Sequence, residues 1–338
     1  MRIGVVIPFF QREPGILARA LTSVAAQRLP AGTSVEVVVV DDASPTPARP
    51  EIDAIAFPDA VRVTLLSQAN AGPGAARNAG LDHLGRRGSD AVAFLDSDDI
   101  WAPEHLGEAV AAMGPGFDLY FCGVVRPSSP ASADDAIPQA LARLRRPGEP
   151  GVAWLRDDGS LVAVEPERLL AGYLETYLSQ TSSVVLSARA ARSVRFDPSL
   201  RLAGEDYMLW MDLALSGVRA AVSSAVNVTC GTGVNIYYSA FDFEGPAVVQ
   251  RVGYNLLFWR RVAGKLAAAG HPTEAASERV RRYRRAYSYL FLRALMRGQV
   301  PSLGLLGRLM REEPLLLPAM PVRFLSVLPR RAAEAVTW

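Results

Sequence analysis

The sequence contains very little cysteine, histidine and lysine. Among 338 residues there are two cysteines (Cys122 and Cys230), three histidines, and a single lysine, Lys265. The two cysteines form no C-x-x-C pair, so neither a disulfide framework nor a thiolate zinc site is expected, and a reduced cytoplasmic protein is predicted. No apolar run reaches the roughly eighteen residues of a membrane-spanning helix. The net charge of +2 argues against a nucleic-acid-binding protein.

Half of the residues are hydrophobic, which is enough for a large buried core. In the first hundred residues, short apolar runs alternate with segments of helical periodicity. This alternation predicts an α/β fold with a mostly parallel sheet flanked by helices, in which ligands bind beyond the carboxyl ends of the strands. The predicted strands are Ile3–Ile7, Val35–Val40, Val61–Leu66 and Ala91–Leu95, and the predicted helices between them are Glu13–Gln27 and Ala75–Leu84.

The remaining two thirds of the chain are less regular. Prolines interrupt residues 126–165, which we interpret as a loop-rich insertion with helical periodicity only at Ala140–Arg146. Residues 1–245 are therefore predicted to form one domain, and residues 246–338 a mainly helical extension. Further predicted elements of the first domain are strands at Phe117–Val125 and Ser182–Ser187 and a helix at Asp206–Leu215.

Three aspartates, Asp96, Asp98 and Asp99, follow the fourth predicted strand. Closely spaced carboxylates repel one another unless water or a cation neutralises them. Mg²⁺ and Mn²⁺ prefer carboxylate oxygens and leave positions open for substrate phosphates. The motif therefore suggests a divalent metal site, and the alternative is a turn with solvated aspartates.

Two further motifs lie at the same predicted edge. Asp41 and Asp42 end the second strand, where a carboxylate could accept a hydrogen bond from a base or a ribose, or simply stabilise a turn. The run from Asn70 to Gly80 places glycines before a helix that contains Arg77, which suits a diphosphate but also an ordinary loop.

Glu205 and Asp206 begin the helix predicted at Asp206–Leu215. Acidic residues at a helix start are favoured as caps and by the helix dipole. A carboxylate is also suited to removing the proton of an attacking sugar hydroxyl. Both interpretations remain open from these residues alone.

In combination, these motifs resemble those of the family-2 glycosyltransferases with the GT-A fold. The run Val5-Val6-Ile7-Pro8-Phe9-Phe10, the acidic pairs, the Asn70–Gly80 run and the Gly204-Glu205-Asp206 motif occur in the family's order. The resemblance covers roughly residues 1–125 and 176–217. It is closest to bacterial exopolysaccharide glucosyltransferases of the succinoglycan type.

The resemblance implies a role for each matching residue. Asp98, with Asp96, would hold Mn²⁺ or Mg²⁺, Asp206 would be the catalytic base, and Glu205 its reserve. The residues expected to bind the nucleotide-sugar are Pro8, Phe10, Asp41, Asp42, Asn70, Arg77, Asp96 and Ser97.

Two positions depart from the family pattern. Trp210-Met211-Asp212 stands where an arginine often follows the acidic pair, and no late histidine is placed to reach the metal, although Asn235 could substitute. The three histidines are expected to be surface or packing residues. A dinucleotide-binding dehydrogenase is excluded because no G-x-G-x-x-G follows the first strand. A haloacid-type phosphatase is excluded because Ile100 stands at the threonine position of its motif.

We therefore predict an inverting, metal-dependent transfer of a sugar, glucose from UDP-glucose, onto a lipid-linked oligosaccharide in exopolysaccharide biosynthesis. Alternatives are transfer of another sugar in cell-surface glycan assembly, or a nucleotide-sugar-binding protein without transfer activity. The arginine-rich C-terminal helices are expected to contact either the inner face of the cell membrane, as a peripheral protein, or a second subunit of a homodimer.

Overall fold

The computed structural model describes residues 1–114, 116–126, 142, 144, 148–201, 203–231 and 246–327. The chain divides into two compact units. The first comprises Met1–Pro198 and Leu209–Val234, and the second comprises Ser199–Met208 and Asn235–Trp338. Helix α8 (Glu205–Leu215) therefore begins in the second unit and ends in the first.

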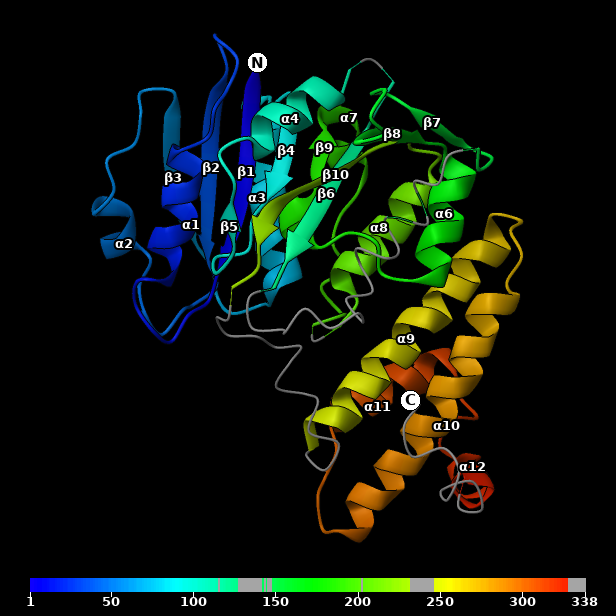
Figure 1. Ribbon diagram of the computed structural model, residues 1–338. Helices are drawn as coiled ribbons and strands as arrows, with labels where there is room; N and C mark the ends of the chain where they lie inside the picture. The colour runs from blue at the N-terminus through cyan, green and yellow to red at the C-terminus, as the bar shows by residue number, and fades with distance from the viewer. Residues whose placement is uncertain are drawn as a thin grey trace. The chain divides into compact units, whose positions relative to one another are not determined.

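The described residues of the first unit form a ten-stranded mixed sheet (Figure 1). Its strand order is β3-β2-β1-β4-β9-β6-β10-β8-β7, and β5 pairs with β10. The bounds are β1 Arg2–Phe9, β2 Ser34–Asp41, β3 Val61–Ser67, β4 Ala91–Phe94, β5 Ile100–Trp101, β6 Leu119–Val125, β7 Val152–Trp154, β8 Leu161–Val164, β9 Val185–Ser187 and β10 Ala220–Thr229.

The N-terminal half of this sheet is parallel, as predicted. Strands β3, β2, β1 and β4 run in the same direction, and β9 then inserts antiparallel between β4 and β6. In the register of β1, Phe9 lies opposite Asp41 of β2, and Val6 lies opposite Phe94 of β4. Neighbouring strands are about 4.8 Å apart, so the residues after β2 and β4 flank the end of β1 at one edge of the sheet.

Helices connect these strands, and glycine lets one of them approach β1 closely. A Cβ atom at Gly4 would lie 2.4 Å from the Leu84 side chain, and one at Gly80 would lie 2.5 Å from the Val6 side chain, so neither position accepts a side chain unless the facing residue shifts. Besides the end of α8, the helices among the described residues of this unit are α1 Ile16–Ala25, α2 Arg49–Asp53, α3 Pro73–Arg87, α4 His105–Ala112, α6 Pro166–Glu175 and α7 Ala188–Ser193, with a 3₁₀ turn, η1, at Thr181–Ser183.

Several predicted boundaries differ from the observed ones. Helix α1 begins at Ile16 rather than Glu13, because Gly15 adopts a left-handed conformation with φ 84°. The predicted strand Ser182–Ser187 is shortened by the 3₁₀ turn. Two strands, β7 and β8, lie within the predicted loop 126–165. The helical periodicity at Ala140–Arg146 falls outside the described residues, apart from positions 142 and 144.

The described part of the second unit is helical, as predicted. Its helices are α9 Pro246–Ala268, α10 Glu274–Met296, α11 Leu303–Glu312 and α12 Met320–Val327. Arg261 contacts Glu312 at 2.8 Å, and Arg284 contacts Glu313 at 2.7 Å through two parallel hydrogen bonds. Among the described residues, every helix is too short or too polar to cross a bilayer.

Candidate active site

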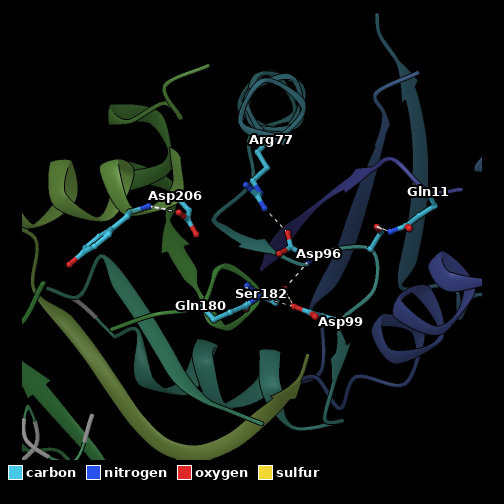
Figure 2. Close-up of polar contacts among 9 residues, drawn as sticks. Gln11, Arg77, Asp96, Asp99, Gln180, Ser182 and Asp206 are labelled. Atoms are coloured by element: carbon cyan, nitrogen blue, oxygen red, sulfur yellow. Dashed lines mark hydrogen bonds and ion pairs between the residues drawn. The ribbon is translucent and has the colours of Figure 1, made fainter. Parts of the chain in front are cut away.

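The acidic motif forms a turn directly after β4, at the carboxyl edge of the parallel strands. Asp96 and Asp98 are half-buried, whereas Ser97 and Asp99 are buried. Arg77, on the second turn of α3, donates a hydrogen bond to Asp96 Oδ1 at 2.6 Å (Figure 2). The guanidinium group of Arg77 also lies 5.2 Å from the ring centroid of Phe196, in a cation–π contact. The turn thus brings Asp96 into contact with Arg77, the residue that was predicted from sequence to bind a diphosphate.

The side chain of Asp99 is buried and joins the acidic turn to two other segments of the chain. Its Oδ2 atom accepts hydrogen bonds from Gln180 Nε2 at 2.9 Å and from Ser182 Oγ at 2.6 Å. Its Oδ1 atom accepts one from the backbone N–H of Gly231 at 2.8 Å. The Asp99 carboxylate is therefore a buried anchor that links η1 and the end of β10 to the acidic turn.

Ser182 connects two of the aspartates. Its hydroxyl accepts a hydrogen bond from the Asp96 backbone N–H at 2.9 Å while donating to Asp99, and Figure 2 shows it between them. The Ser182 carbonyl accepts a hydrogen bond from Trp101 Nε1 at 2.7 Å. Sequence reasoning missed Ser182 and Gln180, because both lie more than eighty positions after the turn and carry no local motif.

Burial and neighbouring charge both act on Asp99. Burial, and to a lesser extent the negative charges of Asp96 and Asp98, raise the pKa of its carboxyl group to about 7. The hydrogen bonds from Ser182 and Gly231 act in the opposite direction. The repulsion indicates that the three carboxyl groups are close in space, which is the electrostatic setting that a cation relieves.

The donor set of the turn fits a cation that is shared with a substrate. Within the described ranges, no three or more histidine, cysteine, aspartate or glutamate side chains are grouped so that they could enclose a metal. Asp96 and Asp98 remain as two half-buried carboxylates. Mg²⁺ is commonly held by one or two carboxylates, with phosphate oxygens and water completing its coordination, so this sparse set suits a phosphate-bridging ion.

Gly231 approaches the acidic turn more closely than any side chain would permit. A Cβ atom at this position would lie 1.9 Å from the Asp98 carbonyl oxygen. Gly231 lies two residues after the end of β10. Strand β10 pairs with β5, whose residues Ile100 and Trp101 directly follow the acidic turn. Glycine is therefore required where this segment crosses the turn.

The second acidic pair organises the glycine loop before α3. Asp42 is 3% exposed, and its carboxylate accepts hydrogen bonds from Gln68 Nε2 at 2.7 Å and from the backbone N–H groups of Ala71 and Gly72 at 2.8 Å. The exposed Asn70 donates through Nδ2 to the Asp42 carbonyl at 3.0 Å. Three donors satisfy most of this carboxylate's capacity, so its observed contacts are those of a loop anchor.

The end of β1 connects to the acidic turn through a glutamine that the sequence analysis did not single out. Buried Gln11 donates through Nε2 to Ser97 Oγ at 3.0 Å (Figure 2), and its backbone N–H donates to Ser44 Oγ at 2.8 Å. The half-buried Asp41 accepts a hydrogen bond from the Ser44 N–H at 2.8 Å. The predicted pocket residues Pro8 and Phe10 precede Gln11 and are also half-buried.

Glu205 and Asp206 lie in the first turn of α8, after Gly204, whose φ is 85°. Asp206 Oδ1 accepts a hydrogen bond from the Tyr207 N–H at 2.6 Å, and both acidic residues belong to the second unit. Further along α8, the first-unit residue Trp210 is fully buried against Phe94 and Phe196. Asn235, the alternative metal ligand, lies outside the described residues.

Comparisons with known proteins agree with this architecture. The profile of the family described as Glycosyl transferase family 2 matches residues 4–155. The succinoglycan biosynthesis protein ExoW of Rhizobium meliloti (strain 1021) is 32% identical over 318 residues, covering 94% of this chain and 95% of ExoW. ExoO, another succinoglycan biosynthesis protein of that organism, is 46% identical over 91 residues, covering 27% of this chain and 24% of ExoO.

A solved structure of S. aureus TarS in complex with UDP-GlcNAc superposes with a TM-score of 0.57 at 18% identity, covering 86% of this chain and 72% of that chain. This likeness concerns the fold, which is of the GT-A type. The near full-length match to ExoW, together with the family profile, establishes that the chain belongs to glycosyl transferase family 2.

Proposed function

We propose that this glycosyltransferase moves glucose from UDP-glucose onto a lipid-linked oligosaccharide during exopolysaccharide biosynthesis, with inversion at the anomeric carbon. The observation that carries the proposal is the turn after β4, where Asp96 is paired with Arg77 and the half-buried Asp98 follows two positions later. The similarity to ExoW over almost the whole chain supports the biosynthetic context. A protein of the same fold that was solved with UDP-GlcNAc makes UDP-sugars the first donors to test.

In this proposal, Asp98 and Asp96 hold Mn²⁺ or Mg²⁺. When bound, the ion supplies Lewis-acid neutralisation of the charge that develops on the departing diphosphate. Arg77 contributes a second positive charge from α3, and its guanidinium fork matches phosphate oxygens. Ion pairing with Asp96 and contact with Phe196 orient this side chain before the donor binds.

Asp206 is the proposed base. It removes the proton from the acceptor hydroxyl as that oxygen attacks the anomeric carbon, while the bond from that carbon to the UDP oxygen breaks. The attacking oxygen and the departing UDP lie on opposite faces of the sugar, which inverts the configuration. Glu205, its neighbour in the first turn of α8, is the reserve candidate.

Pro8, Phe10, Asp41, Asp42 and Asn70 remain the proposed nucleotide-binding set. They lie at or after the ends of β1 and β2 and in the loop before α3. Phe10 would offer an aromatic face for stacking on uracil. The contacts of Asp42 suggest that it acts by holding the backbone of residues 71–72 in place rather than by pairing with the base itself.

The decisive experiment measures sugar transfer by the full chain. Purified protein is incubated with radiolabelled UDP-glucose, Mn²⁺ or Mg²⁺, and membrane lipid extract as acceptor, and lipid-bound label is counted. Asp98→Asn and Asp206→Asn should each reduce transfer by at least about a hundredfold, as expected for loss of a metal ligand or a general base. The matched control is Asp59→Asn, at an exposed aspartate before β3, which should retain wild-type transfer.

The same assay separates the rival function. A nucleotide-sugar-binding protein without transfer activity would be stabilised by donor and metal but would release no UDP and label no acceptor. A thermal-shift panel of UDP-glucose, other UDP-sugars and GDP-mannose identifies the donor, because only a ligand that binds the folded state raises the melting temperature. Full transfer by both aspartate variants would refute the proposed site.

We also propose that the reaction takes place at the cytoplasmic face of the cell membrane, where a lipid-linked acceptor is held. The protein would associate peripherally, through its helical second unit. A homodimer that uses the same helices is the alternative. Flotation with liposomes, with and without residues after 275, tests membrane association.

A further inference from the structure

Exposed apolar side chains are concentrated in the last described part of the second unit. Eight of the thirteen large hydrophobic residues that are exposed within the described ranges lie between positions 295 and 325. Isolated apolar residues are normal on protein surfaces, but a cluster of this kind marks an interaction site. The eight residues, called here the apolar tip, are Leu295, Met296, Val300, Leu303, Leu315, Leu317, Val322 and Leu325.

Helix α12 packs on α10 by one side and exposes an apolar side. The ring of Phe324 stacks on Tyr289 of α10 at a centroid distance of 5.3 Å. Val322 and Leu325, three residues apart and thus on one face, are 71% and 63% exposed. From Pro314 to Val327 the only charged residue is Arg323, so the exposed side chains of this segment are mostly apolar.

The end of α10 continues this surface. Met296 and Val300 are 68% and 76% exposed, and Leu295 and Leu303 are exposed beside them. Leu295 lies six residues after Tyr289, about 9 Å further along the axis of α10, and α12 packs beside this part of α10 (Figure 1). The apolar tip is therefore one region built from the end of α10, the start of α11, and α12 with the loop before it.

The helical part of the second unit carries an excess of positive charge. Residues 246–327 contain fourteen arginine or lysine residues and four glutamates, although the whole chain has a net charge of only +2. Two of these glutamates, Glu312 and Glu313, are paired internally with Arg261 and Arg284. Arg281 and Arg285 are exposed and lie on the same face of α10 as Met296, because Arg285 follows Arg281 by four residues and Met296 follows Arg285 by eleven.

We propose that the apolar tip inserts into the interface of an anionic lipid bilayer and that the arginines of α10 bind its headgroups. Apolar side chains next to exposed arginines are the composition of surfaces that lie in a membrane interface. The excess positive charge favours a lipid surface that is negative, and each arginine near such a surface strengthens binding about fivefold. The inference rests on the proposed function in one respect: the proposed acceptor is lipid-linked, so the enzyme would have to bind at a membrane surface to reach it.

Vesicle flotation of the full chain tests the proposal. The wild-type protein should float with phosphatidylcholine vesicles that contain phosphatidylglycerol and remain unbound with phosphatidylcholine alone. Met296→Ser/Val300→Ser should reduce partitioning by at least tenfold, and Arg281→Gln/Arg285→Gln by about twenty-five-fold at low salt, from two arginines at about fivefold each. The matched control is Trp154→Ser/Val226→Ser, which changes two exposed apolar residues of the first unit and should bind as wild type.

Three outcomes would overturn the proposal. They are no flotation of the wild type with anionic vesicles, wild-type partitioning by the Met296/Val300 variant, and a lipid-free dimer that this variant converts to monomer. The last outcome would assign the surface to a second copy. UDP release from the donor without lipid is measured in parallel. Anionic-vesicle binding without UDP release would contradict the proposed sugar transfer alone, whereas UDP release without such binding would contradict this inference and the proposed membrane association and leave the proposed sugar transfer standing.

Discussion

Ser182→Ala tests the role assigned to the residue that joins Asp96 to Asp99. The substitution removes one hydroxyl and with it two hydrogen bonds, one from the Asp96 N–H at 2.9 Å and one to Asp99 Oδ2 at 2.6 Å. Ser182 is fully buried, so water does not replace the lost partners without rearrangement. The acidic turn then loses both hydrogen bonds to Ser182, and its remaining connection to η1 is the hydrogen bond from Gln180 to Asp99.

The expected magnitude follows from those two bonds. A neutral hydrogen bond contributes about 1 kcal/mol to stability and one to a charged group about 1.5–3 kcal/mol, so the loss is about 3 kcal/mol. For a unit of this size, each kcal/mol lowers the melting temperature by about 2–4 °C, which gives a decrease of about 6–12 °C. Because the Asp96 backbone is released, the KM for the donor should increase about tenfold, equivalent to about 1.4 kcal/mol.

Differential scanning calorimetry and steady-state transfer kinetics measure the two effects. Ser183→Ala is the matched control, since it removes from the adjacent buried residue a single hydroxyl that donates to the Gln180 carbonyl at 2.7 Å. It should lower the melting temperature by about 2–4 °C and leave the donor KM unchanged. Equal melting temperatures and equal KM values for the two variants would refute the positioning role of Ser182.

Three further substitutions test other parts of the first unit. Gly231→Ala places a methyl group 1.9 Å from the Asp98 carbonyl oxygen and so displaces the acidic turn. It should abolish the metal-dependent thermal stabilisation by UDP. Unchanged stabilisation would show that the turn can move to accommodate the methyl group without loss of binding. Arg77→Lys loses the guanidinium fork on Asp96 and the cation–π contact, and should raise the donor KM about tenfold with a smaller change in kcat. Burial lowers the pKa of His105 to about 3, so between pH 6.5 and 3 the unfolded state binds a proton that the folded state does not. Stability should therefore fall as the pH drops through this window by up to about 1.4 kcal/mol per pH unit, and urea unfolding of His105→Gln at pH 7 and pH 5 should lack that contribution.

The parallel strands β1, β2 and β4 could be predicted from sequence because each is a short, mostly buried apolar run that is followed by polar residues. Val35–Val40 lies within β2, and Ala91–Leu95 overlaps β4, since both faces of these strands are covered. Strand β8 was missed because its four residues, Leu161–Val164, follow glycine and serine and owe their conformation to pairing with β10. Such tertiary pairing leaves no local periodicity to detect.

In the candidate site, too, some contacts could be predicted from sequence and others could not. Arg77 and Asp96 could be predicted to lie near one another, because a helix start and a strand end meet at the carboxyl edge of a parallel sheet. The contacts of Asp99 could not be predicted, because its donors come from Gln180, Ser182 and Gly231, which the antiparallel strands β9 and β10 bring back to the turn. Nothing in the local sequence distinguishes these three residues from ordinary turn residues.

The arrangement gives the aspartates of each acidic motif different tasks. Asp42 and Asp99 are each 3% exposed, and each accepts three hydrogen bonds from side chains or backbone N–H groups that are distant in sequence. A buried carboxylate is costly unless such donors satisfy it, and once satisfied it fixes the segments that supply them. Asp42 thereby holds the loop that starts α3, the helix that carries Arg77, and Asp99 holds the turn that carries Asp96 and Asp98. Charged groups that are fixed before a ligand arrives need little reorganisation during reaction, which is how preorganised sites stabilise developing charge.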